Sequence, residues 1–531
     1  MFGTILALDY GTTALKAALY DEALGCMGVA SREWTYSYPA PGFIEHPAEV
    51  YWEKTVSAVN ELLDRFGGRD TLRGISVTGQ SETLIALDGQ GRPLGDAIVW
   101  LDTRAQAECE WLAAHYPADR LYAATGNTGF DPVMPACKLM WMKAHEPERY
   151  AATDKFLLIK EYIIYRLSGR MVGEHSAQSC AGYFDIVRCD WDRGVLDIAG
   201  IDPAKLPELH DSQYVVGPLC GEASRETGIG PQARVVNGLL DQCASVIGAG
   251  AVDETQITET TGTVLAIGAT LKEFDGATPD MLVLRHGLKD RYLALPNCST
   301  AGVLLKWFRD QFMPEGADYD AINREIAARG RKESGLLLLP HFAGYLSPVN
   351  NPQASGALYG LSLDTVRCDV AHAIMEGVGF LLRENLELLE RHGIRSRRII
   401  SLGGGAKSPL WLGIKANICN RAMVTLADEE STALGCAINA ALALGMIALE
   451  DVPGLVRVQN CFDPDAEGAA IYERKYRSYL ALNGRLGFNP PGEVIAPEYP
   501  SVASINHGHQ HSWWFRSLTN PAFNKGCRVC Q

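Results

Sequence analysis

The sequence lacks an excess of basic residues. Its 531 residues include 48 Lys and Arg against 63 Asp and Glu, which gives a formal net charge of −15. This balance argues against general binding to nucleic acid or to an anionic membrane, because both require a basic face. A small anionic ligand is still compatible with it, since backbone N–H groups and Mg²⁺ can hold a phosphate locally.

The chain also lacks a long apolar run and a regular pattern of cysteines. The longest apolar stretch, residues 436–449, is broken by Asn439 and is shorter than the ~20 residues that span a bilayer. The amino terminus reaches Asp9 without a basic segment, unlike a signal peptide. The 14 cysteines show no pairing rhythm and are interpreted as reduced thiols. We therefore expect a cytoplasmic protein.

Two widespread nucleotide-binding motifs are missing as well. The sequence contains neither G-x-G-x-x-G nor G-x-x-x-x-G-K-[ST], so neither a dinucleotide fingerprint nor a P-loop is expected. Instead, the apolar stretch at 399–402 runs into GGGAKS at residues 403–408. Three glycines between a buried strand and a helix let the backbone approach a ligand closely. The alternative is close packing of the strand against the helix.

Short strands and tight turns alternate with helices in two similar rounds. In the first we expect strands at 5–9, 16–20 and 29–36, a helix that Pro47 opens and Gly67 ends, and a strand at 75–78. In the second we expect a strand at 234–237, a helix at 241–249, a hairpin over 258–267, a helix at 301–313 and a strand at 399–402. Apolar periodicity supports these assignments. The pattern predicts an α/β fold of two related halves, each a mixed sheet flanked by helices.

A Gly/Thr turn between two strands occurs once in each half. The first is DYGTT at residues 9–13, and the second is TTGT at residues 260–263. Such a turn presents consecutive N–H groups and hydroxyls to a phosphate, and Asp9 at the end of its strand can hold Mg²⁺ through water. Either turn by itself could be an ordinary hairpin turn. Their pairing predicts a cleft with one turn on each side, and a boundary between the halves near residues 245–255.

Asp241 stands after a predicted strand and a glycine turn, at the start of a helix rich in small residues. The positive end of the helix dipole keeps a carboxylate at this position ionised and therefore basic. A hydroxyl that accepts a phosphoryl group needs such a base within hydrogen-bond reach. The alternative is an Asp that caps the amino end of the helix.

A polar cluster lies after two predicted strands, at residues 79–83 (GQSET) and 100–104 (WLDTR). Short polar side chains and one aromatic plane are what a polyhydroxylated ligand requires, namely paired hydrogen bonds and a stacking face. The alternative is a surface loop that contains an Arg–Asp pair.

In their order along the chain, these motifs resemble those of the FGGY carbohydrate kinases, the family of glycerol kinase, xylulokinase, gluconokinase and ribulokinase. The resemblance covers roughly residues 1–485. It is carried by DYGTTALK at 9–16, GQSETLIALD at 79–88, AIVWLDTR at 97–104, KLMW at 138–141, GLLDQCASVIGAG at 238–250, TTGT at 260–263, GALYGL at 356–361, DVAHAIMEG at 369–377 and GGGAKSPLW at 403–411.

The resemblance implies an actin-like fold of two ribonuclease-H-like domains around a cleft. Residues 1–250 would bind the sugar and residues 251–486 would bind ATP, while residues 487–531 would form a disordered tail. The implied reaction is ATP-dependent, Mg²⁺-assisted phosphorylation of a hydroxyl on a small sugar or polyol, such as the ketopentose xylulose, by in-line transfer. Dimers are common in the family, so a homodimer is implied too.

The motif positions also imply the site residues. The resemblance implies that Asp241 is the catalytic base and that Asp9 and Asp241 lie at the Mg²⁺. It places the nucleotide on Thr12, Thr13, Lys16, Thr261, Gly262, Thr263, Gly302, Gly404, Gly405, Ala406 and Ser408. It places the acceptor on Gln80, Ser81, Glu82, Trp100, Asp102 and Gln242.

Departures from the family patterns bear on the acceptor. Glycerol kinases carry Arg where Ser81 stands, an aromatic residue where Val133 stands and Phe where Val264 stands, which argues against glycerol. Xylulokinases typically have Gln-Met-His after the glycine, in place of Gln-Ser-Glu at 80–82, and Gly-Glu-Arg-Thr-Pro where this chain reads GYLSP at 344–348. The pattern therefore leaves a pentulose, a deoxy sugar and a tetritol open.

Two alternative functions are compatible with many of the same motifs. An actin-like ATPase without a small acceptor, or a non-catalytic sugar sensor of the same fold, would share many of these motifs. The tail carries three histidines and two cysteines, at positions 507, 509, 511, 527 and 530. Their spacing is unlike that of a zinc finger, which favours a disordered extension over a metal site.

Overall fold

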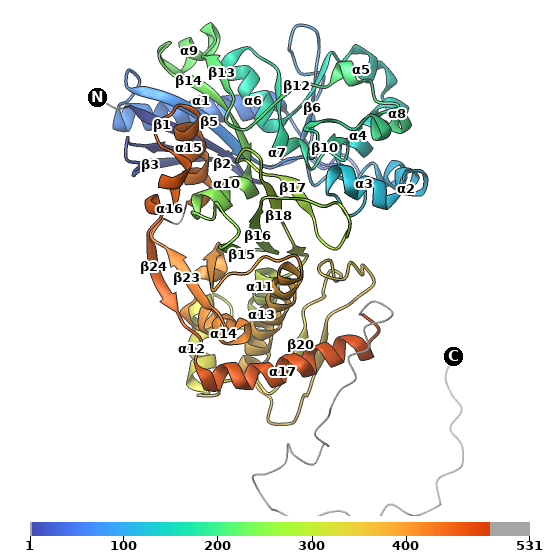
Figure 1. Cartoon of the computed structure of the whole chain (residues 1–531), viewed down its shortest axis with the longest axis vertical. Helices are drawn as coiled ribbons and strands as arrows, with labels where there is room; N and C mark the ends of the chain where they lie inside the picture. The colour runs from blue at the N-terminus through green and yellow to red at the C-terminus, as the bar shows by residue number, and fades with distance from the viewer. Residues whose placement is uncertain (1–2, 429, 489–531) are drawn as a thin grey trace, which may run out of the picture.

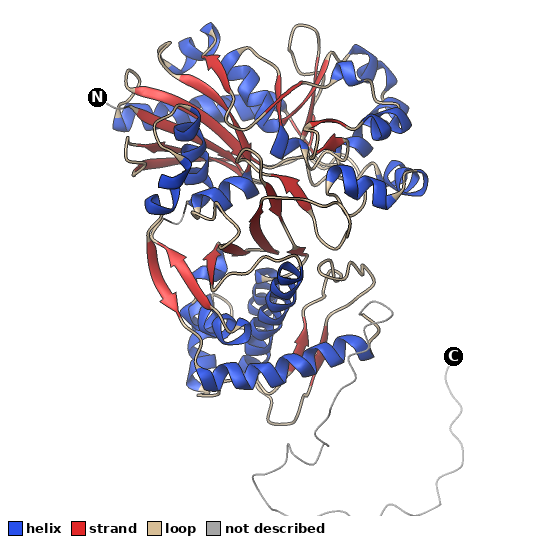
Figure 2. Cartoon of the chain, in the orientation of Figure 1, coloured by secondary structure: helices blue, strands red, loops and turns tan. Residues whose placement is uncertain are grey.

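The computed structural model describes residues 3–428 and 430–488. It has an α/β fold with two halves, each built on a mixed sheet with helices on its faces (Figures 1 and 2). This confirms the predicted fold class. The histidines and cysteines of the predicted tail lie outside the described residues. In the part of the chain that is described, no helix combines the length and apolar character needed to cross a membrane, and the cysteines are free thiols.

The first half contains a six-stranded sheet in the order β13-β14-β5-β1-β2-β3 and a four-stranded sheet in the order β4-β7-β6-β8. Its strands are β1 Thr4–Tyr10, β2 Ala14–Tyr20, β3 Cys26–Glu33, β4 Glu45–His46, β5 Leu72–Gly79, β6 Leu84–Leu87, β7 Ala97–Ile98, β8 Lys155–Leu158, β9 Val172–Glu174, β10 Phe184–Asp185, β11 Asp190–Trp191, β12 Glu208–His210, β13 Val215–Pro218 and β14 Arg234–Leu240. Its helices are α1 Ala48–Phe66, α2 Gln106–His115, α3 Ala118–Thr125, α4 Pro135–His145, α5 Pro147–Ala152, α6 Ile159–Ser168, α7 His175–Gln178, α8 Arg193–Ala199, α9 Gly221–Thr227 and α10 Asp241–Gly248.

The second half contains an eight-stranded sheet in which β17-β18-β16-β15-β22-β23-β24 are neighbours and β19 pairs with β16. Its strands are β15 Ile257–Thr261, β16 Leu265–Leu271, β17 Val283–Arg285, β18 Tyr292–Ala294, β19 Asn297–Cys298, β20 Leu337–Leu339, β21 Ala357–Tyr359, β22 Arg398–Leu402, β23 Ala422–Leu426 and β24 Val458–Phe462. Its helices are α11 Gly302–Phe312, α12 Tyr319–Ala328, α13 Arg367–Arg391, α14 Pro409–Cys419, α15 Ser431–Ala443, α16 Val452–Leu455 and α17 Ala466–Arg485.

The two sheets repeat one strand arrangement. In the first, β1 is antiparallel to β2 and parallel to β5, and β5 is parallel to β14. In the second, β15 is antiparallel to β16 and parallel to β22, and β22 is parallel to β23. Each Gly/Thr turn joins the antiparallel pair of its sheet, as the sequence predicted. The internal repeat is therefore real at the level of topology.

Helix α15 crosses back from the second half to the first, where it covers one face of β1 and β5 (Figure 1). The core between them contains small residues of α15, among them Ala437 and Ala440. Where α15 crosses α10 the two backbones touch. A Cβ on Gly248 would lie 1.8 Å from the carbonyl oxygen of Ser431, and one on Gly435 would lie 1.8 Å from that of Ala244. Only glycine fits at either position.

Two local expectations were wrong in detail. The third strand, expected at 29–36, is β3 at Cys26–Glu33. The aromatic residues after β3 bind the first turn instead of extending the strand, since Trp34 Nε1 donates to Thr12 O at 3.1 Å and Tyr36 Oη donates to the same oxygen. The residue that caps α10 is Leu240, and Asp241 is its first helical residue, without a side-chain capping bond. The capping interpretation of Asp241 is therefore wrong.

Candidate active site

Three parallel strands end side by side at one edge of the first sheet. Tyr10, the last residue of β1, is in register with Gly79 of β5, and Gly79 is in register with Leu240 of β14. The carboxyl ends of parallel strands are where α/β sheets bind ligands. This register brings Asp9 to the same edge as the loop after β5 and Asp241 after β14.

Asp9 lies in a charged group at this edge. It is opposite Lys16 in the β1–β2 pair, and Lys16 Nζ donates to both oxygens of Glu430, at 2.7 and 2.9 Å. Glu430 immediately precedes α15, so its ion pair with Lys16 of β2 connects the second half of the chain to the first. Burial, and after it the charge of Asp241, raises the pKa of Asp9 to about 7, while Lys16 acts in the opposite direction. The two carboxylates are therefore close enough to repel each other.

Asp241 is half-buried at the amino end of α10. Burial raises its pKa to about 6, against a hydrogen bond from the backbone of Gln242. At neutral pH such a carboxylate is ionised yet more basic than an exposed Asp, which suits a proton acceptor. Gln242 is the next residue of the helix and is also half-buried.

The loops after β5 and β7 each present one donor that is buried without a partner. Gln80 Oε1 accepts a hydrogen bond from Thr83 Oγ1 at 2.6 Å, which turns the amide nitrogen away from Thr83. Within the described chain, Gln80 Nε2 and Trp100 Nε1 have no hydrogen-bond partner although both atoms are buried. Buried donors are normally satisfied, so these two donors are available to the acceptor oxygens of a ligand. Sugar hydroxyls are such acceptors.

Glu82, two residues after Gln80, has a φ of 51°, in the left-handed region that residues with side chains rarely adopt. Backbone strain of this kind is frequent at binding sites. Lys138 Nζ holds the loop by donating to Glu82 O and Val99 O, both at 2.9 Å. Burial raises the pKa of Glu82 and lowers that of Lys138, and each group's charge offsets part of the other's shift.

Ser81 and Asp102 make bonds to the protein itself. Ser81 Oγ donates to Ala177 O at 2.7 Å. Asp102 is fully buried, and its oxygens accept from Arg104 at 2.8–3.0 Å and from the Ile44 N–H at 2.6 Å. Its acceptor positions are thus used. The Arg–Asp pair foreseen as an alternative is present, but in the interior and not in a surface loop.

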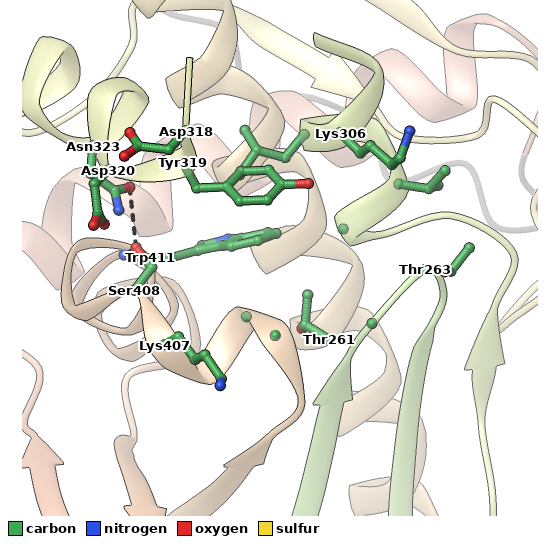
Figure 3. Close-up of a pocket in the computed structure, with 16 residues that line it drawn as sticks. Thr261, Thr263, Lys306, Asp318, Tyr319, Asp320, Asn323, Lys407, Ser408 and Trp411 are labelled. Atoms are coloured by element: carbon green, nitrogen blue, oxygen red, sulfur yellow. Dashed lines mark hydrogen bonds between the residues drawn. The ribbon is translucent and has the colours of Figure 1, made fainter. Parts of the chain in front are cut away.

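The second turn borders a cavity of about 580 Å³ in the other half of the chain (Figure 3). Seven of the residues predicted to bind the nucleotide line it: Thr261, Gly262, Thr263, Gly302, Gly404, Gly405 and Ser408. Ala406 lies in the same glycine turn but is not part of the lining. Thr12, Thr13 and Lys16 are on the other sheet, at the first turn.

Close backbone contacts shape the wall of this cavity. Gly302 N donates to Gly262 O at 2.8 Å, and a Cβ on Gly302 would lie 2.4 Å from that oxygen. A Cβ on Gly405 would lie 2.5 Å from Cβ of Thr261. The glycines of GGGAKS therefore agree with both alternatives, because they pack closely against the neighbouring turn and also leave the cavity open to a ligand.

Thr261 is fixed by a buried ion pair. Lys415 Nζ lies 2.8 Å from Glu259 Oε1 and 2.6 Å from Thr261 Oγ1, and the Thr261 hydroxyl donates to Glu259 Oε2 at 2.7 Å. The side chains of Lys415 and Glu259 are completely buried. Sequence reasoning missed both residues, which are far apart in the chain and belong to no short motif.

Sequence reasoning also missed the aromatic part of the cavity. Tyr319 and Trp411 both line it, and Figure 3 shows their rings reaching into it. Trp411 is held in place by its Nε1, which donates to Met375 O at 3.0 Å. Asn323 accepts a hydrogen bond from Ser408 Oγ at 3.2 Å through its Oδ1. Aromatic faces and amides suit a purine base. Trp411 ends the GGGAKSPLW motif, so its position was the one available signal.

Asp9 and Asp241 are the residues that could receive a divalent cation, but only together with ligands from water or from a bound phosphate. The described residues contain no group of three or more His, Cys, Asp or Glu side chains placed to hold a metal. Asp9 and Asp241 are two carboxylates at one sheet edge, and a cation between them would relieve their repulsion. Mg²⁺ is commonly held by one or two carboxylates together with water and phosphate.

Comparisons with known proteins agree with this geometry. Models of the N-terminal and C-terminal domains of the FGGY family of carbohydrate kinases match residues 4–248 and 258–444. A xylulose kinase from Staphylococcus epidermidis is 29% identical over 482 residues, covering 90% of this chain and 96% of that protein. A glycerol kinase from Thermococcus gammatolerans is 29% identical over 475 residues, covering 87% and 93%. The crystal structure of ligand-bound xylulose kinase from Lactobacillus acidophilus superimposes with a TM-score of 0.85 at 25% identity, covering 92% and 99%.

Proposed function

Because this chain belongs to the FGGY family of carbohydrate kinases, it is a phosphotransferase that uses ATP, and we propose that its acceptor is xylulose. The xylulose kinases among its relatives support this choice. The predicted carbohydrate kinase function is thereby confirmed.

The observation that carries the proposed site is the convergence of Asp241 with open donors at one sheet edge. The sugar lies between the loops after β5 and β7, where the unpartnered Gln80 Nε2 and Trp100 Nε1 donate to its oxygens. Ser81, Glu82 and Gln242 border it, and Asp102 acts through Arg104, which it orients. Ser81 in place of Arg leaves room beside the acceptor and disfavours glycerol.

We assign Asp241 as the general base. Its carboxylate accepts the proton of the attacking hydroxyl while the oxygen of that hydroxyl bonds to the γ-phosphorus of ATP and the bond to the ADP oxygen breaks. The purine of ATP occupies the cavity of Tyr319 and Trp411, and its phosphates extend between the two Gly/Thr turns. Lys16 lies beside the first turn and is placed to contact them.

Asp9 and Asp241 are the residues that would hold Mg²⁺. When bound, this ion neutralises the phosphate charge and orients the phosphates for in-line attack. Closure of the two halves around both substrates would exclude water and so limit ATP hydrolysis. A homodimer, a cytoplasmic location and the absence of nucleic-acid and membrane partners stay predictions.

The test is a substitution together with an acceptor screen. Asp241→Asn keeps the size of the side chain and removes its basicity, so turnover should fall by roughly 10²–10⁴-fold, the usual contribution of a positioned base. ADP binding, measured by calorimetry, should remain. Wild-type turnover in this variant would show that Asp241 is not the base. ATP consumption with xylulose should exceed that with other pentuloses, hexuloses, tetritols, glycerol and gluconate, and a faster acceptor among them would replace xylulose.

A further inference from the structure

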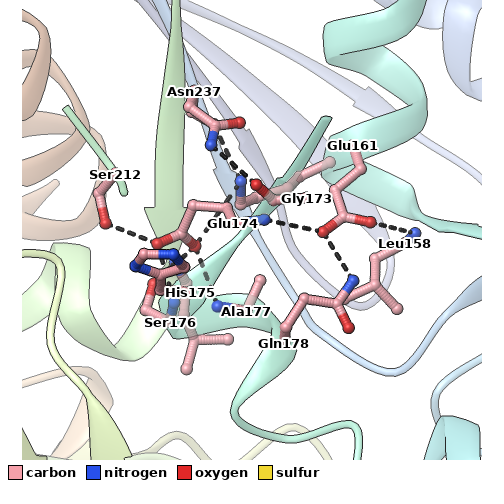
Figure 4. A network of polar contacts seen from close by, with 12 residues as sticks. Leu158, Glu161, Gly173, Glu174, His175, Ser176, Ala177, Gln178, Ser212 and Asn237 are labelled. Atoms are coloured by element: carbon pink, nitrogen blue, oxygen red, sulfur yellow. Dashed lines mark hydrogen bonds and ion pairs between the residues drawn. The ribbon is translucent and has the colours of Figure 1, made fainter. Parts of the chain in front are cut away.

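A buried polar network lies behind the proposed site and is not used by the chemistry (Figure 4). At its centre is Glu174, the residue before α7, with no exposed surface. Lys160 Nζ, also buried, lies 3.7 Å from Glu174 Oε2 and compensates its charge. Burying such a pair is costly unless the geometry is good and further hydrogen bonds are made. The hydrogen bonds that Glu174 makes therefore show which segments of the chain the network holds in place.

Glu174 accepts four hydrogen bonds. Oε1 accepts from Ser176 N at 2.8 Å and from Ser212 Oγ at 2.6 Å. Oε2 accepts from Ser176 Oγ at 2.7 Å and from Ala177 N at 2.9 Å. Each oxygen thus faces one backbone N–H, which cannot reverse its direction, and one hydroxyl. An amide in place of the carboxylate would have to point its NH₂ group at a backbone N–H.

Two of these bonds lead directly to the proposed site. Because the Ser176 hydroxyl donates to Glu174, its oxygen is free to accept, and Leu240 N donates to it at 2.9 Å. Leu240 immediately precedes Asp241. Ala177, whose N–H is bonded to Glu174, accepts from Ser81 Oγ at 2.7 Å through its carbonyl oxygen. One carboxylate therefore connects the start of α10 with the loop that receives the sugar.

We propose that Glu174 is a positioning residue that acts through Ser176 on Asp241 and through Ala177 on Ser81. It fixes the distance between the base and the acceptor hydroxyl, although it touches neither substrate. The proposal rests on the proposed function, because it takes Asp241 as the base. The alternative is that Glu174 is only the cap of a short helix and contributes stability alone.

Two buried serines bonded to the same carboxylate provide a matched test. Ser176→Ala removes the bond to Leu240. Ser212→Ala removes only the bond between the Ser212 hydroxyl and Glu174, and within the described residues that hydroxyl has no bond to the residues next to Asp241 or to Ser81. Each change deletes one buried hydroxyl and should lower the melting temperature, Ser176→Ala somewhat more because its hydroxyl makes two hydrogen bonds and that of Ser212 makes one. Ser176→Ala should also lower kcat by about 10–100-fold, since a misplacement of ~1 Å can cost about 10²-fold, with KM for ATP unchanged. Ser212→Ala should leave kcat at the wild-type level.

Equal kcat in the two serine variants would overturn the proposal, and so would a fall in kcat that only tracks the loss of folded protein. Glu174→Gln is a second variant for which the same fall in kcat at unchanged KM for ATP is expected, and wild-type kcat in it would also contradict the proposal. Asp241→Asn, assayed alongside with xylulose and ATP, separates the two hypotheses. If it keeps wild-type turnover, the proposed base fails. If it is inactive while Ser176→Ala is fully active, only the positioning role fails.

Discussion

The two Gly/Thr turns share one topology but differ in how their charges are arranged. At the first turn, Asp9 has a raised pKa, and the side chains of the Lys16–Glu430 pair are 44% and 34% exposed. At the second, the Lys415–Glu259 pair is completely buried and tied to the Thr261 hydroxyl. One turn keeps charges accessible and in conflict, while the other keeps them paired and enclosed.

This difference indicates that the two related halves have different roles. Conflicting carboxylates at a sheet edge are a source of perturbed pKa values, which acid–base chemistry and cation binding require. A paired and fully hydrogen-bonded charge supports a rigid wall, which binding requires. We therefore expect changes at the first turn to act mainly on activity, and changes at the second to act mainly on stability.

The largest expected effect is on the buried pair. Lys415→Met leaves Glu259 as an unpaired charge in the interior, and removing one partner of a buried pair costs about 3–5 kcal/mol in the free energy of unfolding. The matched change, Lys16→Met, breaks an exposed pair worth about 0–1 kcal/mol. Chemical denaturation of the two variants measures both costs.

Activity should show the reverse order. Lys16→Met should raise KM for ATP by about tenfold or more, because a hydrogen bond to a charged group contributes about 1.5–3 kcal/mol. In the Lys415→Met protein that remains folded, the rise in KM for ATP should be smaller than in Lys16→Met. If Lys16→Met destabilises the chain as much as Lys415→Met, the contrast between the turns is wrong.

The next effect is a pH dependence that belongs to the first half alone, through Asp241 and Asp9. A general base must be ionised, and the pKa of Asp241 is raised to about 6, so kcat/KM should fall by about tenfold for each pH unit below 6. Because the pKa of Asp9 is about 7, the decline should begin near neutrality and steepen below pH 6. Steady-state rates from pH 5 to 9 measure the profile. A flat profile down to pH 5 would contradict both assignments.

The last effect is a change in the melting temperature of Asp9→Asn. The folded pKa of Asp9, about 7, lies above its ordinary value of 3.8, so the wild type loses stability as pH rises through this interval. Asn carries no charge, so the variant should be more stable than the wild type at pH 8 and should lose this advantage at pH 4. Each kcal/mol corresponds to about 2–4 °C in a domain of 150–250 residues. A difference that is larger at pH 4 would show that the carboxylate is not in conflict.

Sequence patterns predicted most of the elements near the site, since each depends on local apolar spacing. The strand that became β14, the hairpin of β15 and β16, and helix α11 are all where the periodicity placed them, within a few residues. The position of β3 was wrong because Trp34 and Tyr36 have strand-forming side chains, yet tertiary hydrogen bonds to Thr12 hold them in the loop after the strand. Local propensity carries no information about such a distant partner.

The site was predictable only where its residues lie in short motifs. Asp9, Asp241 and the glycine turn belong to such motifs, and the register of β1, β5 and β14 explains why the two carboxylates lie at one edge. Glu174 and Lys415 had no such motif, because the residues they hold in the site, reached from Glu174 through Ser176 and Ala177, are distant in sequence. A buried charge in a sequence looks the same as one on a solvated face, and only the fold reveals which partners it has.

The return of α15 to the first half has a consequence for biosynthesis. During synthesis, β1 and β5 leave the ribosome first. The helix that covers their apolar face, Ser431–Ala443, follows only about 350 residues later. A nascent chain that ends after α10 would therefore carry an uncovered sheet, which favours association with other chains or with chaperones. Cutting the gene at the boundary between the halves should give an N-terminal product that is soluble only when the second piece is co-expressed.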